Sequence, residues 1–128
     1  MKKLNVFRSD NAIISYVLEK VGETELAAVY FQDYYDYAMK DTSIYNQLSK
    51  SVYYDHNGEA EKATKALKLF LEQDNYHYWT ILFLRTDPLI DKMKTHPEYQ
   101  KTLKDLEDKF WRNHDEIRSS LSKKGLLD

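Results

Sequence analysis

The feature that most constrains the fold of this chain is a pattern that occurs twice. The segment GETELAAVYF begins at Gly22 and the segment GEAEKATKAL begins at Gly58, so the two copies lie 36 residues apart. In both copies an alanine, Ala27 or Ala63, follows the glycine by five positions, and a large apolar residue follows the alanine by four positions. A glycine lets the chain reverse between two antiparallel helices. A small alanine lets those helices approach closely, and the large residue fills the wider gap beyond it. A fixed period of this length is typical of a solenoid of helix pairs.

Capping residues and turns divide the rest of the chain into helical segments. Three glycines and two prolines are few helix breakers for 128 residues, and no long run alternates between apolar and polar residues as a strand would. Asp87-Pro88 and His96-Pro97 each have the form of a helix start with proline in the first turn. We therefore predict an all-α fold with helices over residues 12–21, 23–40, 44–55 and 76–84, another within 57–73, a short one over 88–94, and a long final helix that ends near Gly125.

The chain has the length of one domain and can bury a core. We predict that residues 1–8 form a linker or a partly ordered extension and that residues 9–128 form one helical domain. Within this domain, residues 9–41 are the first repeat and residues 43–74 are the second. Residues 75–128 then form an incomplete third repeat with a C-terminal cap.

The repeated pattern, written Gly-x4-Ala-x3-Phe/Leu-x2-aromatic, resembles the second half of a tetratricopeptide repeat. In that family a large residue lies four positions before the glycine, and Leu18 and Tyr54 occupy this place here. The first helices depart from the family pattern, because Asn11 and Gln47 stand where the family has tryptophan. Ser15 and Ser51 occupy the position where the family has a small residue. The resemblance covers roughly residues 9–84 and implies a right-handed α-α superhelix.

The C-terminal third has a second resemblance. The segment DPLIDKMKTHPEYQKTLKDL is similar to the segment that closes many bacterial tetratricopeptide proteins. The following KFWRNHDEIRSSLSKKGLL resembles the tails of bacterial repeat-bearing transcription regulators and signalling proteins. This resemblance implies that the chain is the regulatory or sensing C-terminal part of such a protein, with a long capping helix at its end.

The family arrangement also implies a binding groove, because the first helix of each pair lines the concave face of the superhelix. That face would mix aromatic, aliphatic and charged groups, as peptide-binding surfaces do. It lacks the set of lysines and asparagines with which some family members hold a terminal carboxylate, so that specificity is not expected. The implied groove residues are Ala12, Tyr16, Glu19, Lys20, Leu48, Val52, Asp55, His56, His77 and Thr80.

The second helix is aromatic on more than one side. Phe31, Tyr34 and Tyr35 should face its partner helices, whereas Tyr30 and Tyr37 lie on another side. A surface helix is not normally apolar on so many faces. Tyr30 and Tyr37 therefore indicate a self-association face or contact with a neighbouring repeat in a longer chain. Alternatively, they are amphipathic rim residues.

The final helix carries a heptad-like apolar seam. Its residues follow one another in steps of 4, 3, 4, 7 and 4 positions, and His114 fills the gap: Tyr99, Leu103, Leu106, Phe110, Ile117 and Leu121. The seam can pack on the solenoid as a cap, or it can pair with a partner or with a second copy of the chain.

Composition disfavours several functions. The net charge is −2 with interspersed charges, whereas domains that grip phosphate backbones usually carry a basic excess, so no direct nucleic-acid contact is expected. The chain has no cysteine, no run of about 20 apolar residues that could span a membrane, and no leader-like start. We therefore expect a cytoplasmic protein.

No catalytic, metal or cofactor site is expected from the sequence either. None of the four histidines has another histidine at helical ligand spacing, and the three glycines stand alone rather than in a phosphate loop. The sequence thus predicts a non-catalytic module that binds a protein or peptide. An alternative is a helical domain that senses a small molecule in an aromatic pocket between repeats.

Overall fold

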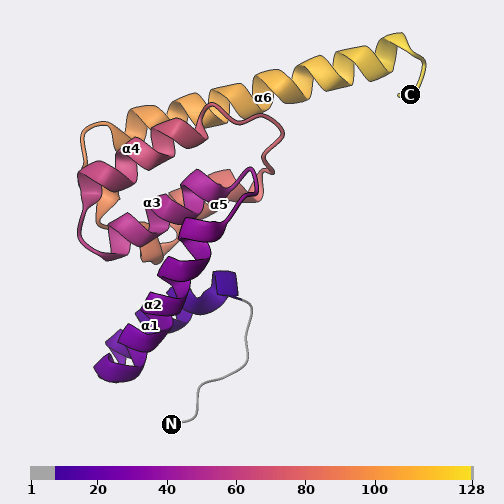
Figure 1. The fold of residues 1–128 in the computed structure, drawn as a ribbon. Helices are drawn as coiled ribbons and strands as arrows, with labels where there is room; N and C mark the ends of the chain where they lie inside the picture. The colour runs from indigo at the N-terminus through magenta and orange to yellow at the C-terminus, as the bar shows by residue number, and fades with distance from the viewer. Residues whose placement is uncertain (1–7, 128) are drawn as a thin grey trace.

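A computed structural model describes residues 8–127 of the chain, and all of the regular structure in this range is helical. The predicted linker or extension over residues 1–8 lies, except for residue 8, outside the described residues. The α-helices are α1 (Asn11–Lys20), α2 (Thr24–Lys40), α3 (Asn46–His56), α4 (Ala60–Phe70), α5 (Trp79–Thr86) and α6 (Tyr99–Lys123) (Figure 1). Three short 3-10 helices complete the order: η1 (Arg8–Asp10), η2 (Pro88–Ile90) and η3 (Met93–Thr95). The prediction of an all-α fold is confirmed for the described residues.

The two copies of the sequence pattern form two helical hairpins, α1–α2 and α3–α4, with the same turn. Gly22 and Gly58 adopt left-handed backbone conformations, with φ of 86° and 78°. Each glycine is followed by a glutamate whose N–H donates back into the first helix, from Glu23 to the carbonyl of Leu18 (2.9 Å) and from Glu59 to that of Tyr54 (2.8 Å). Because the same hydrogen bond closes both turns, the turns of the two hairpins are equivalent.

A pair of buried serines repeats the equivalence inside the hairpins. Ser15 donates its hydroxyl proton to the carbonyl oxygen of Ala27 (2.8 Å), and Ser51 donates to that of Ala63 (2.7 Å). Both serines are fully buried, and both alanines are at most 1 % exposed. A hydroxyl can cross between the helices here because the small residues bring the two backbones close together. The internal repeat read from the sequence is therefore also a repeat of contacts.

The main core lies where α3 and α4 meet α5, η2, η3 and the first half of α6. Its fully buried members include Leu67, Phe70, Ile81, Ile90 and Leu106. Ion pairs connect the last helix to this body: Lys68 of α4 lies 2.7 Å from Glu98, and Arg85 of α5 pairs with Glu107.

The segment after α5 is the main local departure from the predicted helices. Asp87 caps η2 as expected and accepts a hydrogen bond from the N–H of Leu89 (2.9 Å). The expected helix over 88–94 is instead divided into η2 and η3. The reason is tertiary: the N–H of Met93, which an α-helix would direct to residue 89, donates to the buried carboxylate of Asp55 on α3.

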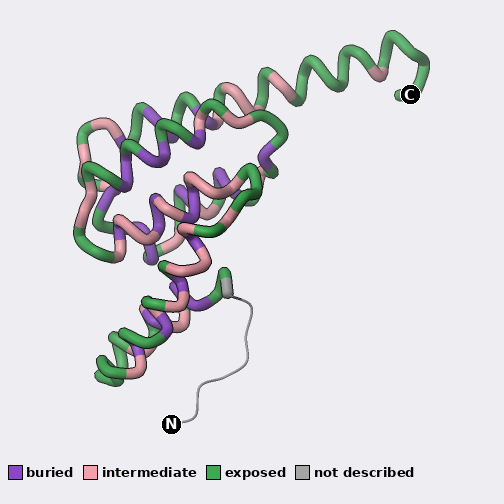
Figure 2. Tube along the Cα trace, viewed as in Figure 1, coloured by how far each residue is buried: buried purple, intermediate pink, exposed green. Residues whose placement is uncertain are grey.

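Helix α6 differs along its length. Tyr99, Thr102, Leu103 and Leu106 are buried against the body, whereas no residue from 111 to 127 is buried (Figure 2). The predicted cap therefore describes the first half of the helix. The second half extends beyond the other helices (Figure 1).

Candidate functional site: a pocket between α1, α3 and α5

A pocket of about 370 Å³ opens where the first helices of the two hairpins approach α5. Side chains of α1, α3 and α5 form much of its wall, together with residues from the end of α2 and the loop that follows it. The lining residues are Ser9, Asp10, Ala12, Ile13, Tyr34, Tyr37, Ser43, Tyr45, Leu48, Ser49, Val52, Trp79, Phe83 and Leu89.

Aromatic rings from three segments shape this pocket. Tyr45, just before α3, lies with its ring 5.2 Å from that of Trp79 on α5, and its hydroxyl accepts a hydrogen bond from the N–H of His77 (3.1 Å). Tyr34 and Tyr37 of α2 have ring centroids 5.9 Å apart. Trp79 remains 48 % exposed although it lines the pocket. An exposed indole beside fixed rings is the kind of anchor position that binding surfaces use.

Hydrogen bonds fix the wall on the side of α2 and α3. Tyr34 is buried and donates its phenolic proton to the carbonyl oxygen of Ser49 (2.8 Å). Asp41 accepts from the N–H of Ser43 (2.9 Å) and from the hydroxyl of Ser49 (3.1 Å). Burial raises the pKa of the Tyr37 phenol, and the nearby Asp41 carboxylate raises it further. Tyr37 therefore stays a neutral hydrogen-bonding group at physiological pH.

The described lining of the pocket contains a single charged group, which is negative. Asp10 is the single charged side chain among the described lining residues, and it is exposed. The other polar lining groups are hydroxyls of serines and tyrosines. The lining thus combines a large apolar surface, several hydroxyls and one carboxylate.

Three of the implied groove residues come together at this pocket. Ala12, Leu48 and Val52 lie on its wall, each at most 5 % exposed because α1, α3 and α5 crowd around them. Thr80 is fully buried on α5 and is not among the lining residues, since it points into the core instead. The expectation that Thr80 offers a contact to a partner is therefore wrong for this structure.

The other implied groove residues of α1 and α3 gather at the far ends of these helices. Glu19 and His56 lie 3.2 Å apart and join the two hairpins, and the His56 ring packs 4.4 Å from that of Phe31. Tyr16 is half-buried beneath the Lys20 ammonium, which lies 5.2 Å from the centre of its ring. These residues thus form two pairs, Glu19 with His56 and Tyr16 with Lys20, and none of the four lines the pocket.

Asp55 and His56 are covered by the chain itself, which corrects their assignment to an open groove. The Lys92 ammonium donates to the carbonyl oxygen of His56 (3.0 Å), and the N–H of Met93 donates to the carboxylate of Asp55. Burial raises the pKa of Asp55, although the Met93 and Lys92 contacts act in the opposite direction. The segment that holds η2 and η3 therefore occupies this end of the expected groove.

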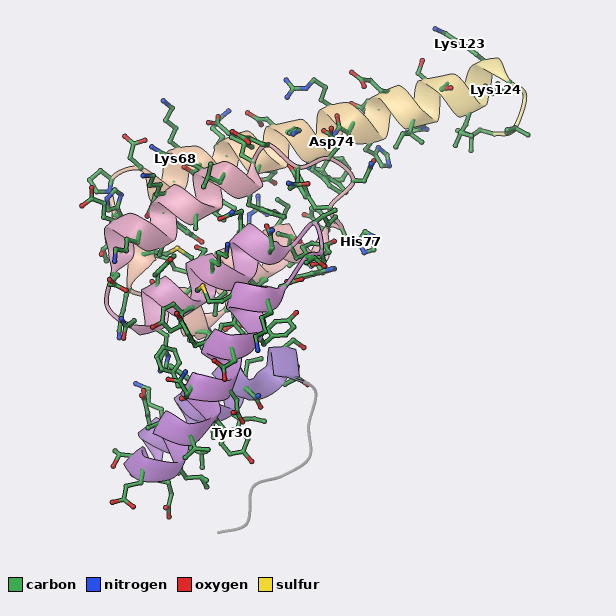
Figure 3. The ribbon with its side chains drawn as sticks, viewed as in Figure 1. Tyr30, Lys68, Asp74, His77, Lys123 and Lys124 are labelled. Carbon is green, nitrogen blue, oxygen red and sulfur yellow. The ribbon has the colours of Figure 1, made fainter. Side chains whose placement is uncertain are left out.

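Tyr30 and Tyr37, the two tyrosines of α2 that were expected to share a face, lie in different environments. Tyr30 is only 2 % exposed, so it is not available as a self-association face in this structure (Figure 3). Tyr37 is half-buried and belongs to the pocket. His77 is exposed and does not line the pocket, although its ring lies 6.5 Å from that of Tyr45.

Sequence reasoning missed Tyr45, Trp79 and Phe83 as pocket residues. Their spacing carries no motif, because they come from two different segments and meet only when α5 packs beside α3. The one available signal was the aromatic density of the stretch YHYWTILF, residues 76–83.

Within residues 8–127 no group of three or more metal-ligating side chains gathers at one place. No helix in the same range is both long and apolar enough to cross a membrane. In comparisons with known proteins, no family model, curated protein or solved structure matched the chain.

Proposed function

We propose that this chain is a non-catalytic binding module built from tetratricopeptide-like helix pairs in a right-handed superhelix. The observation that carries the proposal is the aromatic pocket between α1, α3 and α5, since these are the helices that would line the concave face of such a superhelix. The equivalent turns and serine contacts of the two hairpins support the repeat architecture.

The lining of the pocket favours a particular kind of partner. A bulky apolar side chain of a protein or peptide would fill the space between Trp79, Phe83 and Val52. A basic residue next to it would meet Asp10, the charged group of the lining. Charge complementarity of this kind contributes specificity and association rate more than affinity.

The role of such a module follows from the sequence resemblance. The C-terminal segments resemble those of bacterial repeat-bearing regulators, which makes a regulatory or sensing part of a signalling or transcription protein the preferred biological setting. Direct binding to nucleic acid is not part of the proposal, because the net charge of the chain is −2.

The test compares two residues of α5 that are equally exposed, Trp79 and Leu82, each 48 %. Trp79 lines the pocket and Leu82 does not. The whole chain is used as bait in a lysate of the source cells, together with Trp79→Ala and Leu82→Ala variants. We expect a partner retained by the original chain and by Leu82→Ala, with at least about tenfold weaker binding to Trp79→Ala, which corresponds to about 1.4 kcal/mol.

A partner that binds Trp79→Ala as well as the original chain would contradict the pocket as the binding site. Direct titration of the purified pair then gives the affinities. Because Trp79 and Trp111 are the two tryptophans of the chain, a Trp111→Phe background leaves Trp79 fluorescence as the report of pocket occupancy.

A small-molecule sensor is a second candidate, which the volume of the pocket favours. About 370 Å³ lies within the range of about 300–1,000 Å³ that ligand pockets span. An arylethylamine such as tryptamine would combine a ring for the aromatic wall with a cation for Asp10. A rise in melting temperature with tryptamine that is absent in Trp79→Ala would support this candidate. No rise with either protein would count against it.

A further inference from the structure

A lysine of α6 holds the loop between α4 and α5, residues 71–78. The Lys109 ammonium donates to the carbonyl oxygens of Leu71 (2.7 Å) and Gln73 (2.8 Å), and it lies 3.2 Å from the carboxylate of Asp74. An ammonium has three protons to donate, so these acceptors match it in number. The Lys109 side chain is only 18 % exposed, and partial burial strengthens such charge-assisted contacts. The beginning of the loop is therefore fixed to α6.

Two tyrosines continue this attachment to the end of the loop. The buried Tyr76 donates its hydroxyl proton to the carbonyl oxygen of Leu106 (2.5 Å), and the ring of Tyr78 lies 5.3 Å from that of Phe110. Leu106, Lys109 and Phe110 follow one another at steps of three and one, so they share one side of α6. The loop thus follows one side of this helix from residue 71 to residue 78.

The same loop also reaches the pocket. His77 lies between the two tyrosines, and its N–H donates to the hydroxyl of Tyr45 (3.1 Å). Trp79, which follows the loop directly, has its ring 5.2 Å from that of Tyr45. Figure 3 shows Asp74 beside α6 and His77 farther from that helix. The loop therefore connects α6, which contributes no described residue to the pocket lining, with two rings that do line the pocket.

The middle of the loop has an unfavourable backbone conformation. Asn75 has a φ of 63°, and it is the one residue other than glycine with positive φ in the described range 8–127. A residue with a β-carbon adopts this conformation at a cost, and the conformation persists where the surrounding contacts over-determine it. Here the contacts lie on both sides, at Lys109 and at Tyr76. They fix the turn at Asn75, and the turn sets the direction in which the chain enters α5.

We propose that Lys109 is a positioning residue of the pocket. By holding residues 71–74 against α6, it places His77 and Trp79 against Tyr45. This inference rests on the proposed function, since it concerns the same pocket, and it adds that α6 controls the aromatic wall. Without the ammonium, the carbonyls that it holds turn to water, the turn at Asn75 relaxes, and the Trp79 ring moves away from Tyr45.

The first test needs no ligand and follows Trp79 fluorescence in a Trp111→Phe background. Lys109→Met keeps an unbranched side chain and removes the ammonium, whereas Lys109→Arg keeps a charged donor. Because Trp79 is 48 % exposed, complete release of its ring would about double its accessible area. We therefore expect acrylamide quenching of Trp79 to increase by up to about twofold in Lys109→Met, and to return toward the original value in Lys109→Arg.

The matched control is Lys104→Met on the same helix. The Lys104 ammonium is exposed and lies 2.7 Å from Asp108, also on α6, so this variant loses the same charge away from the loop. It should leave Trp79 quenching unchanged. Circular dichroism of the same samples separates positioning from stability. A lower melting temperature of Lys109→Met with unchanged quenching of Trp79 in the folded protein would overturn the proposal, as would an equal change in Lys104→Met.

Hydrogen exchange in the original chain tests the coupling without a substitution, so the proposal stays open to refutation even if Lys109→Met does not fold. The N–H of Gln73 donates to the carbonyl oxygen of Phe70 at the end held by Lys109, and the N–H of His77 donates to Tyr45 at the other end. If the loop moves as one unit, both amides should show the same free energy of opening. Rapid exchange at His77 with full protection at Gln73 would contradict the coupling.

Binding distinguishes this proposal from the proposed function. Tryptamine is the probe, and the melting temperature is followed by circular dichroism. If tryptamine stabilises the original chain, Lys109→Met should weaken its binding by roughly 2- to 30-fold, the range that couplings between sites span, and Lys109→Arg should not. Equal binding to Lys109→Met and the original chain would overturn the role of Lys109. If tryptamine binds neither protein, the small-molecule candidate fails, and Trp79 quenching still decides the role of Lys109.

Discussion

At the scale of single residues, Asp55 shows how one side chain can determine the course of a distant segment. Its carboxylate is 1 % exposed and accepts the N–H of Met93, which therefore does not continue a helix from Pro88. The charge of this carboxylate has a cost, because burial raises its pKa above the ordinary value. The hydrogen bond that the Asp55 carboxylate accepts stabilises the fold, whereas the buried negative charge destabilises it.

We predict that Asp55→Asn and Asp55→Ala behave differently. The amide oxygen of asparagine can still accept from Met93, so Asp55→Asn should keep the free energy of unfolding within about 1 kcal/mol of the original protein at neutral pH, or raise it. Asp55→Ala leaves the Met93 N–H without its acceptor and should cost about 1–3 kcal/mol. Urea unfolding of both variants measures the difference.

The pH dependence of this comparison has a definite sign. A folded-state pKa above the unfolded value means that the contribution of Asp55 to stability is present below the unfolded pKa and is lost as pH rises through the folded pKa. The stability of Asp55→Asn relative to the original protein should therefore increase from acid toward neutral pH. A decrease would show that the charged carboxylate itself stabilises the fold.

At the scale of elements, the two hairpins depend on the same backbone device. Gly22 and Gly58 have positive φ, and a β-carbon added at either would meet no atom within 4 Å. The cost of a side chain at these positions is therefore local backbone strain alone, without a clash.

We predict that Gly22→Ala and Gly58→Ala each lower the free energy of unfolding by about 1 kcal/mol, and that the double variant loses the sum. Gly125→Ala is the matched control, because Gly125 has a similar φ of 69° but ends the projecting part of α6. Strain there should leave global stability almost unchanged. Strongly unequal losses at Gly22 and Gly58 would show that the hairpins are not energetically equivalent.

At the scale of the whole molecule, three buried tyrosines join parts of the chain that are distant in sequence. Tyr34 donates to Ser49, Tyr76 donates to the carbonyl of Leu106 (2.5 Å), and Tyr99 donates to that of Leu84. Together these bonds connect α2 with α3, the loop after α4 with α6, and α6 with α5. Burial raises the pKa of each phenol, to about 12 for Tyr76.

These tyrosines predict a loss of stability in alkali. The unfolded chain releases its phenolic protons near pH ~10, whereas the folded chain holds them until the raised pKa values are reached. The unfolded state thus binds fewer protons in this window, and the free energy of unfolding falls as pH rises above about 10. Urea unfolding at increasing pH measures the slope, and Tyr76→Phe should make it shallower. An unchanged stability up to about pH 12 would contradict this account.

The sequence by itself determined the helical hairpins. The Gly-Glu turns, the spacing of Ala27 and Ala63, and the Asp87-Pro88 cap all act over a few residues, so their consequences can be read from neighbouring positions. Register within each helix follows from the same local pattern. Hence the helix order and the 36-residue repeat needed no knowledge of distant contacts.

Only the tertiary structure decided which surfaces remain open. The pocket exists because α5 packs beside α3 and brings Trp79 to Tyr45. At the other end of α3, Lys92 and Met93 cover His56 and Asp55. The seam of α6 reads as uniform in sequence, yet its inner residues are buried and Ile117 is exposed, because the body of the protein is shorter than the helix. Whether a surface is exposed or covered depends on the packing between elements. A local sequence pattern does not encode where a helix extends beyond its neighbours.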